Sequence, residues 1–141
     1  MTGRLIALKV PCNVVDRRGA TPLFCAASAG NADGVALLLK AGAECDRAMR
    51  GGMTPLMAAI RSRRGSAVWE PLVRRSARID ARDRSGRTAL HYAAEYSEDP
   101  ELIKALIARG ASRTRCDRQG RTPAEIAAEH GRDKIVSLLR P

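Results

Sequence analysis

The sequence predicts an all-α solenoid of small stacked units rather than one globular core, and three regularities support that prediction. One pattern recurs four times at intervals of 33, 34 and 34 residues along the 141-residue chain: Thr21-Pro22-Leu23-Phe24, Thr54-Pro55-Leu56-Met57, Thr88-Ala89-Leu90-His91 and Thr122-Pro123-Ala124-Glu125. Each copy leads into a pair of alanines: Ala26-Ala27, Ala58-Ala59, Ala93-Ala94 and Ala127-Ala128. A glycine or serine followed by alanine then stands at a nearly constant distance after each of the first three copies: Gly42-Ala43, Ser76-Ala77 and Gly110-Ala111. A period near 33 indicates tandem units, and such stacks form extended surfaces that usually hold other proteins.

Two helices are expected in each unit. The threonine can cap a first helix and the proline suits its first turn, where the missing N–H is not needed. The paired alanines give that helix a thin face that lets the next unit approach closely. Second helices are indicated by apolar stripes: Leu37, Leu38 and Leu39; Leu102, Ile103, Leu106 and Ile107; Ile135, Val136, Leu138 and Leu139. Gly42 and Gly110 lie where a left-handed residue should end such a helix. Asp99-Pro100-Glu101 is typical of a helix start, with a cap, a first-turn proline and an acid that favours the helix dipole.

The second unit departs from the pattern at its second helix. A long basic turn, residues 61–66, replaces the short turn of the other units, and Pro71 falls inside the expected helix. Because a proline in a helix interior costs about 3 kcal/mol, we predict that this helix begins late, near Trp69, with Pro71 in its first turn. Ser76 stands where other units have glycine, so the end of this helix should be weaker. Trp69 itself is expected to pack in the core.

The four motifs in register resemble the ankyrin repeat, whose signature is Thr-Pro-Leu-His-x-Ala at a period of 33. The resemblance covers residues 16–140, because an aspartate precedes the threonine by five residues in three units and a glycine precedes it by two in all four. It implies a helix-turn-helix pair per repeat, with a β-hairpin finger between neighbouring repeats. The predicted repeats are residues 16–48, 49–82, 83–116 and 117–141, and residues 1–15 would be the tail of a partial repeat. Either the terminal repeats cap the stack, or the chain is part of a longer array.

Composition excludes a membrane span and indicates a reducing compartment. The sequence has no run of 18 apolar residues, and the apolar stretch Leu5–Leu8 is too short for a signal peptide. The four cysteines, Cys12, Cys25, Cys45 and Cys116, have no spacing typical of a metal site. Cys12 and Cys45 occupy equivalent places in adjacent repeats, which in this family stack roughly 10 Å apart, beyond the reach of a disulfide at about 7 Å. Free thiols favour the cytoplasm or the nucleus.

The charge indicates an anionic partner. Arginine accounts for 21 of the 25 basic residues, and the net charge is +10. In ankyrin repeats the contact positions are the fingers and the exposed face of the first helix. The finger positions here carry Arg17, Arg18, Arg50, Arg84, Arg87, Arg118 and Arg121, with Met53 beside them; the helix-face positions include Arg61, Glu95, Tyr96, Glu129 and His130. Because the guanidinium fork binds two oxygens at once, we expect these residues to hold an acidic or phosphorylated protein segment. The alternative is that arginine simply fills solvated surface, since Arg74, Arg75, Arg78, Arg109 and Arg132 lie away from the fingers.

The residues offer little for catalysis or for a cofactor. Of the two histidines, His91 occupies the fourth position of the motif, where the resemblance implies a structural hydrogen bond to neighbouring backbone. His130 maps to the exposed edge of a helix, where it could contact a partner. No paired carboxylates, metal-ligand cluster or phosphate-binding glycine loop is evident, so we expect no enzyme, cofactor or metal site. Nucleic acid is a stronger rival because arginine binds phosphate, but single-strand binders need stacking aromatics and this chain has few.

The sequence thus predicts a non-catalytic, monomeric interaction domain that presents a preformed concave surface. Its central anchors are expected to be Tyr96, Met53 and Arg87, with outer arginines steering approach. Two uses compete within this class. One is a stand-alone inhibitor or adaptor, and the other is the targeting module of a larger signalling or effector protein.

Overall fold

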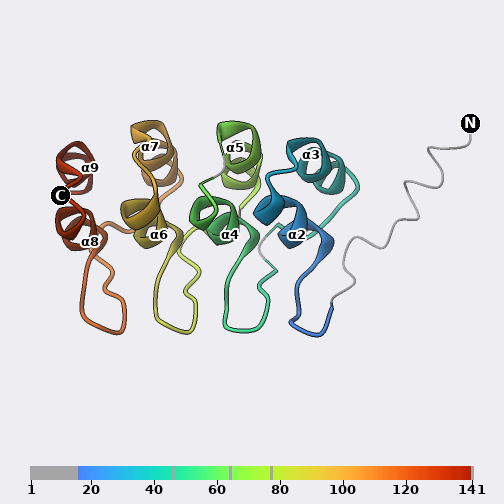
Figure 1. Cartoon of the computed structure of the whole chain (residues 1–141), viewed down its shortest axis with the longest axis horizontal. Coiled ribbons are helices and arrows are strands. Elements are labelled where there is room, and N and C mark those ends of the chain that lie inside the picture. Colours follow the sequence, from blue (N-terminus) through green and yellow to red (C-terminus); the bar gives the residue numbers. More distant parts are fainter. Residues whose placement is uncertain (1–15, 46, 64, 77, 141) are drawn as a thin grey trace, which may run out of the picture.

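Four helix pairs stand side by side in a row, with loops that all extend from the same side (Figure 1). The computed structural model describes residues 16–45, 47–63, 65–76 and 78–140. The pairs are α2 (Pro22–Ala29) with α3 (Ala32–Lys40), α4 (Pro55–Arg61) with α5 (Ser66–Arg75), α6 (Ala89–Tyr96) with α7 (Pro100–Ala108), and α8 (Pro123–Glu129) with α9 (Asp133–Leu139). The partial repeat predicted for residues 1–15 and Cys12 lie outside the described residues. No helix in the described segments is long and apolar enough to cross a membrane.

The threonine of each motif caps a first helix, as predicted. Thr21 Oγ1 accepts a hydrogen bond from Phe24 N at 3.1 Å, and Thr54 Oγ1 accepts one from Met57 N at 3.2 Å. In α8 the cap is reciprocal, because the Glu125 carboxylate accepts from Thr122 N at 2.9 Å. These bonds satisfy N–H groups that have no partner within the helix.

First helices pack on first helices and second on second, so the stack has two layers (Figure 1). The layer of α2, α4, α6 and α8 lies between the loops and the layer of α3, α5, α7 and α9. Their shared core contains fully buried side chains from every pair, including Leu23, Leu72, Leu90, Ile103, Ile126 and Leu139. Leu37 does not belong to it: 57% of this residue is exposed, so the stripe predicted on α3 is narrower than expected.

The prediction for the start of α5 is wrong. The helix begins at Ser66, three residues before Trp69, and Pro71 lies in its interior. The early start brings Val68 and Trp69 onto the same buried face as Leu72, and each of the two is only 4% exposed. Burying two such side chains gains about 1.5–3 kcal/mol each, which together matches or exceeds the cost of about 3 kcal/mol for an interior proline. Trp69 packs in the core, as predicted.

The fingers are tight turns linked to one another. In finger 3 (residues 83–87), Asp83 Oδ1 accepts hydrogen bonds from Ser85 N and Arg87 N, both at 2.9 Å. Finger 1 (16–20) and finger 4 (117–121) repeat this geometry with Asp16 and Asp117, whereas finger 2 (49–53) has Met49 in place of the aspartate. The expected β-hairpins are not confirmed, because the described residues contain no strand.

Backbone hydrogen bonds join each finger to the next. Arg50 N donates to Arg18 O at 2.7 Å, Arg84 N donates to Gly51 O at 2.6 Å, and Arg118 N donates to Ser85 O at 2.9 Å. Gly52 allows the second of these contacts, because its φ is +81° and a Cβ there would lie 2.8 Å from Asp83 Cα. The turns are therefore held in a fixed row, which fixes the backbone positions from which their side chains extend.

Candidate interaction surface

Four predicted contact residues meet in one hollow between fingers 3 and 4. Arg84, Arg87, Arg118 and Arg121 line a pocket of about 330 Å³, together with Ser85, Asp117 and Gln119. The bond from Arg118 N to Ser85 O fixes the two fingers side by side at this point. We call this hollow the arginine pocket.

Two of its arginines are held by acids of the protein itself. The Arg121 guanidinium pairs with Asp117 at 3.3 Å and with Glu129 at 3.0 Å. Arg87 pairs with Glu95 from the first helix of its repeat, and both side chains are largely buried. Burial would raise the pKa of Glu95, but the hydrogen bond and charge of Arg87 outweigh it, so the pKa lies below its ordinary value. Glu95 and Glu129 therefore bind finger arginines rather than lying apart from them.

The other two arginines of the pocket differ in having no acid paired with them in the described residues. Arg84 and Arg118 are exposed, and within the described ranges neither forms an ion pair with an acid. Asp117 does not compensate them, because it is 6% exposed and its carboxylate already binds Arg121 and two backbone N–H groups. Those hydrogen bonds overcome burial and keep the pKa of Asp117 low, so its charge is present and locally neutralised.

Arg87 also anchors an aromatic column on α6. Its guanidinium carbon lies 4.6 Å from the centre of the Tyr92 ring, a cation–π contact. The Tyr92 hydroxyl donates to Asp83, and burial together with that bond raises the pKa of Tyr92. Tyr96 stacks on Tyr92 with ring centres 6.2 Å apart. The expected anchors Arg87 and Tyr96 thus belong to one preformed cluster.

A second hollow, with an apolar floor, lies over repeats 1 and 2. It measures about 330 Å³ and is lined by Arg18, Phe24, Ser28, Met49, Met53, Ala58, Arg61 and Ser62. Phe24 and Ala58 are buried beneath it, with Met49 and Met53 packed against them. It brings together three predicted contact residues, Arg18, Met53 and Arg61. We call it the methionine pocket.

Sequence reasoning missed two residues of the methionine pocket, Phe24 and Met49. The signal was present at both positions. Phe24 stands where repeat 3 has His91, and Met49 stands where the other fingers have aspartate. Two apolar replacements at neighbouring polar positions indicate a local apolar patch.

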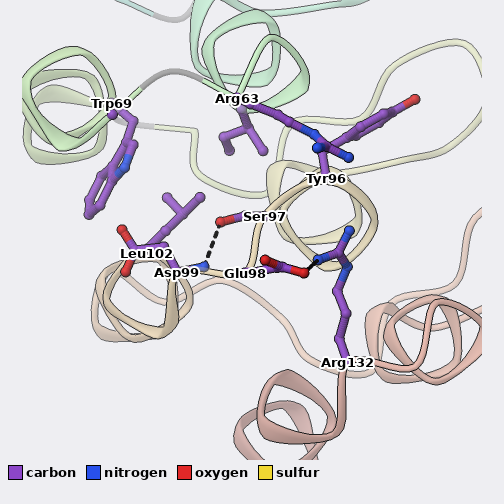
Figure 2. A pocket seen from close by; sticks show the side chains of 10 residues that line it. Arg63, Trp69, Tyr96, Ser97, Glu98, Asp99, Leu102 and Arg132 are labelled. Carbon is purple, nitrogen blue, oxygen red and sulfur yellow. Dashed lines mark hydrogen bonds and ion pairs between the residues drawn. The ribbon is translucent and has the colours of Figure 1, made fainter.

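The remaining predicted residues lie outside both pockets. Arg17 and Arg50 are exposed on fingers 1 and 2. His130 ends α8, where its Nδ1 lies 2.9 Å from Ile126 O. Tyr96 lines a third hollow of about 330 Å³ beside Trp69 and Arg132, at the turns that join the helices of repeats 2 and 3 (Figure 2). Arg132 there pairs with Glu98 at 3.1 Å and donates to Glu95 O at 3.0 Å.

His91 has the structural role implied by the ankyrin resemblance. It is fully buried, its Nδ1 accepts from Thr88 N at 3.1 Å, and its Nε2 donates to Arg121 O at 3.0 Å. Burial lowers its pKa, which favours the neutral ring that these bonds require. Within the described residues no group of His, Cys, Asp or Glu is arranged to hold a metal ion.

Two comparisons with known proteins test the resemblance to ankyrin repeats. A search of curated proteins found no match. The family model for ankyrin repeats, which describes three copies, matches residues 2–83 and again residues 65–141. Those two matches cover nearly the whole chain, and the capped helix pairs and linked finger turns agree with them. The chain belongs to the ankyrin-repeat family.

Proposed function

We propose that this chain is a protein–protein interaction domain that binds an acidic or phosphorylated segment of its partner across the finger surface, meaning the four fingers and the exposed face of the first helices. Ankyrin repeats are generally protein interaction modules and are typically non-catalytic. The arginine pocket supports the more specific proposal of an acidic or phosphorylated segment. Arg84 and Arg118 remain exposed there, beside two arginines already paired with acids. The linked turns fix the backbone that carries these groups before binding, so the loops themselves need not be ordered by the partner.

A direct nucleic-acid role is the weaker alternative. Arginine would supply affinity for phosphate, but Phe24, Trp69 and Tyr92 are all at least 92% buried and offer no stacking platform. Binding to mixed oligonucleotides, measured against salt, separates the two functions. A micromolar complex at physiological salt with a steep salt slope would favour nucleic acid.

The proposal also covers the oligomeric state, the cellular compartment and the use of the domain. We propose a monomer acting in the cytoplasm or nucleus, where its thiols stay reduced. It serves either as a stand-alone adaptor or inhibitor, or as the targeting module of a larger signalling or effector protein. The gene context distinguishes these two uses.

The test is a charge swap with a control of equal charge. Affinity purification with mass spectrometry would compare the wild type, Arg84→Glu with Arg118→Glu, and Arg74→Glu with Arg78→Glu. The control pair is exposed and lies away from the fingers. We expect the finger variant alone to lose the partners of the wild type. Unchanged partners for the finger variant, or equal loss in both variants, would contradict an acid-binding finger surface.

A further inference from the structure

We propose that the finger surface binds a segment with two anchors, an apolar side chain in the methionine pocket and a phosphorylated serine or threonine in the arginine pocket. The inference rests on the proposed function and makes it more specific, because it assigns a different chemistry to each end of the surface. Both ends carry finger arginines, but only repeats 1 and 2 add the apolar Phe24 and Met49.

The charge of the arginine pocket fits one phosphate better than one carboxylate. Arg87 and Arg121 are neutralised by Glu95, Glu129 and Asp117, which leaves two guanidinium groups, those of Arg84 and Arg118, for a ligand. A phosphoserine carries a charge of about −1.5 to −2 and three acceptor oxygens, so one group can engage two forks. A single carboxylate carries half that charge and fills one fork.

The methionine pocket fits an apolar side chain. Its floor combines the buried Phe24 and Ala58 with the half-buried Met49 and Met53, whose flexible thioethers adapt to the shape of a guest. The exposed Arg18 and Arg61 also line it. Arg18 pairs with Asp16 at 3.5 Å, so Arg61 is the better placed of the two to meet an acidic residue that flanks the apolar one. Finger 2 is suited to this role because it lacks the aspartate that folds the other three turns.

The stacking of the repeats sets the spacing of the two anchors. The methionine pocket spans repeats 1 and 2 and the arginine pocket spans repeats 3 and 4, so their centres are two repeats apart. Packed helices lie about 8–10 Å apart, which gives a separation of roughly 20 Å. An extended segment covers about 3.3–3.6 Å per residue, so the two anchor residues should be about six positions apart.

Fluorescence anisotropy with labelled peptides tests the inference. The reference peptide has leucine and phosphoserine six positions apart in a Gly/Ser/Ala background, made in both orders because the structure does not fix chain direction. Comparison peptides carry unphosphorylated serine or glutamate in place of phosphoserine, alanine in place of leucine, or a spacing of three. Each is titrated against the wild type, Arg84→Ala with Arg118→Ala, and the control Arg74→Ala with Arg78→Ala.

We expect one order of the reference peptide to bind tightest, and each single change to weaken it by about tenfold or more. Loss of the phosphate removes charge-assisted hydrogen bonds, loss of leucine removes apolar burial, and a spacing of three keeps the two anchors from binding at once. The Arg84/Arg118 variant should lose the phosphate preference and the control should keep it.

Equal binding of the glutamate peptide through the same arginines would overturn the phosphate assignment while leaving the proposed function intact. Indifference to spacing or to leucine would overturn the two-anchor arrangement, and failure of every phosphopeptide to exceed its serine counterpart would overturn the whole inference. The proposed function is decided separately by partner capture, which depends on neither phosphate nor spacing.

Discussion

At the scale of single residues, the structure separates finger arginines that pair with an acid of the protein from exposed finger arginines that, among the described residues, pair with none. Arg87 reaches Glu95, eight positions away, by crossing from a finger to the helix that follows it. Arg84 occupies the same finger yet pairs with no acid in the described part of the chain. Sequence position alone treats the two as equivalent. Only the fold shows which guanidinium is already bound.

The Arg87–Glu95 pair should make the free energy of unfolding depend on pH in the acidic range. Glu95→Gln should lower the free energy of unfolding at pH 7 by about 1–2 kcal/mol, because a partly buried charge-assisted hydrogen bond is lost. Since folding lowers the pKa of Glu95, the stabilisation is present above the unfolded-state pKa of about 4.3 and is lost as pH falls through the folded-state value. Urea titrations of both proteins should therefore converge below pH 4. A constant difference at every pH would contradict the pairing.

The buried His91 should make the free energy of unfolding depend on pH nearer to neutrality. Its ring is hydrogen-bonded as the neutral form, since Nδ1 accepts from Thr88 N and Nε2 donates to Arg121 O. The folded-state pKa is lowered by burial, so the unfolded chain takes up a proton first as pH falls below about 6.5, and stability declines. Wild type should lose more stability than His91→Gln between pH 7.5 and 5.5 in matched chemical denaturation. Equal loss in both proteins would show that His91 does not titrate with unfolding.

At the scale of the helix, α5 shows how far local rules reach. The Thr-Pro starts of α2, α4 and α8 followed directly from capping chemistry, because their signal lies within four residues. The start of α5 did not, because the cost of Pro71 was weighed without the burial of Val68 and Trp69. Leu37 shows a related limit: consecutive leucines cannot all face the core of one helix.

Replacing the interior proline should stabilise the protein. Pro71→Ala restores a donor to the carbonyl of Ala67 and removes a clash, against a small loss from greater freedom in the unfolded chain. We expect a gain of about 1–2 kcal/mol in chemical denaturation, below the full interior penalty of about 3 kcal/mol because the helix has already adapted. Pro100→Ala is the matched control, since Pro100 begins α7 where proline is favoured, and it should be neutral or slightly destabilising. A loss of stability in Pro71→Ala would mean that packing of the ring outweighs the missing bond.

At the scale of the whole molecule, equivalent arginines join neighbouring repeats. Arg75 donates to Leu39 O at 3.2 Å, and Arg109, 34 positions later, donates to Ser76 O at 2.6 Å. Each therefore binds a carbonyl near the end of the second helix in the preceding repeat. This periodic contact explains part of the arginine excess that lies away from the fingers.

Removing these contacts should weaken the coupling between repeats. Arg75→Ala and Arg109→Ala should each cost about 1 kcal/mol, the net value of an average hydrogen bond. Because repeat stacks are stabilised through nearest neighbours, the double variant should also unfold less cooperatively. Denaturation monitored by circular dichroism and by Trp69 fluorescence measures both effects, and Arg78→Ala serves as the exposed control. Coincident transitions with no loss of stability would show that the contacts are incidental.

The repeat architecture was readable from the chain because its signals are local and occur four times. The site was only partly readable, since its composition depends on pairings between elements. Arg87 and Arg121 were expected to contact a partner, which stays a prediction, and their pairing with acids of the chain was not foreseen; Phe24 and Met49 were not expected and form the floor of a pocket. The pairs Arg87–Glu95 and Arg121–Glu129 share a spacing of eight residues, but only the fold shows that this spacing brings a finger arginine onto an acid of the following helix.

The most direct test of the proposed role is to map where a captured partner binds. Backbone NMR spectra of the labelled chain would be compared before and after adding the partner that the wild type recovers. We predict that the shifted signals cluster in fingers 2 to 4 and on α2, α4 and α6, including those of Met53, Arg84 and Arg118. Shifts confined to the layer of α3, α5, α7 and α9 would contradict the account, because that layer lies away from the fingers.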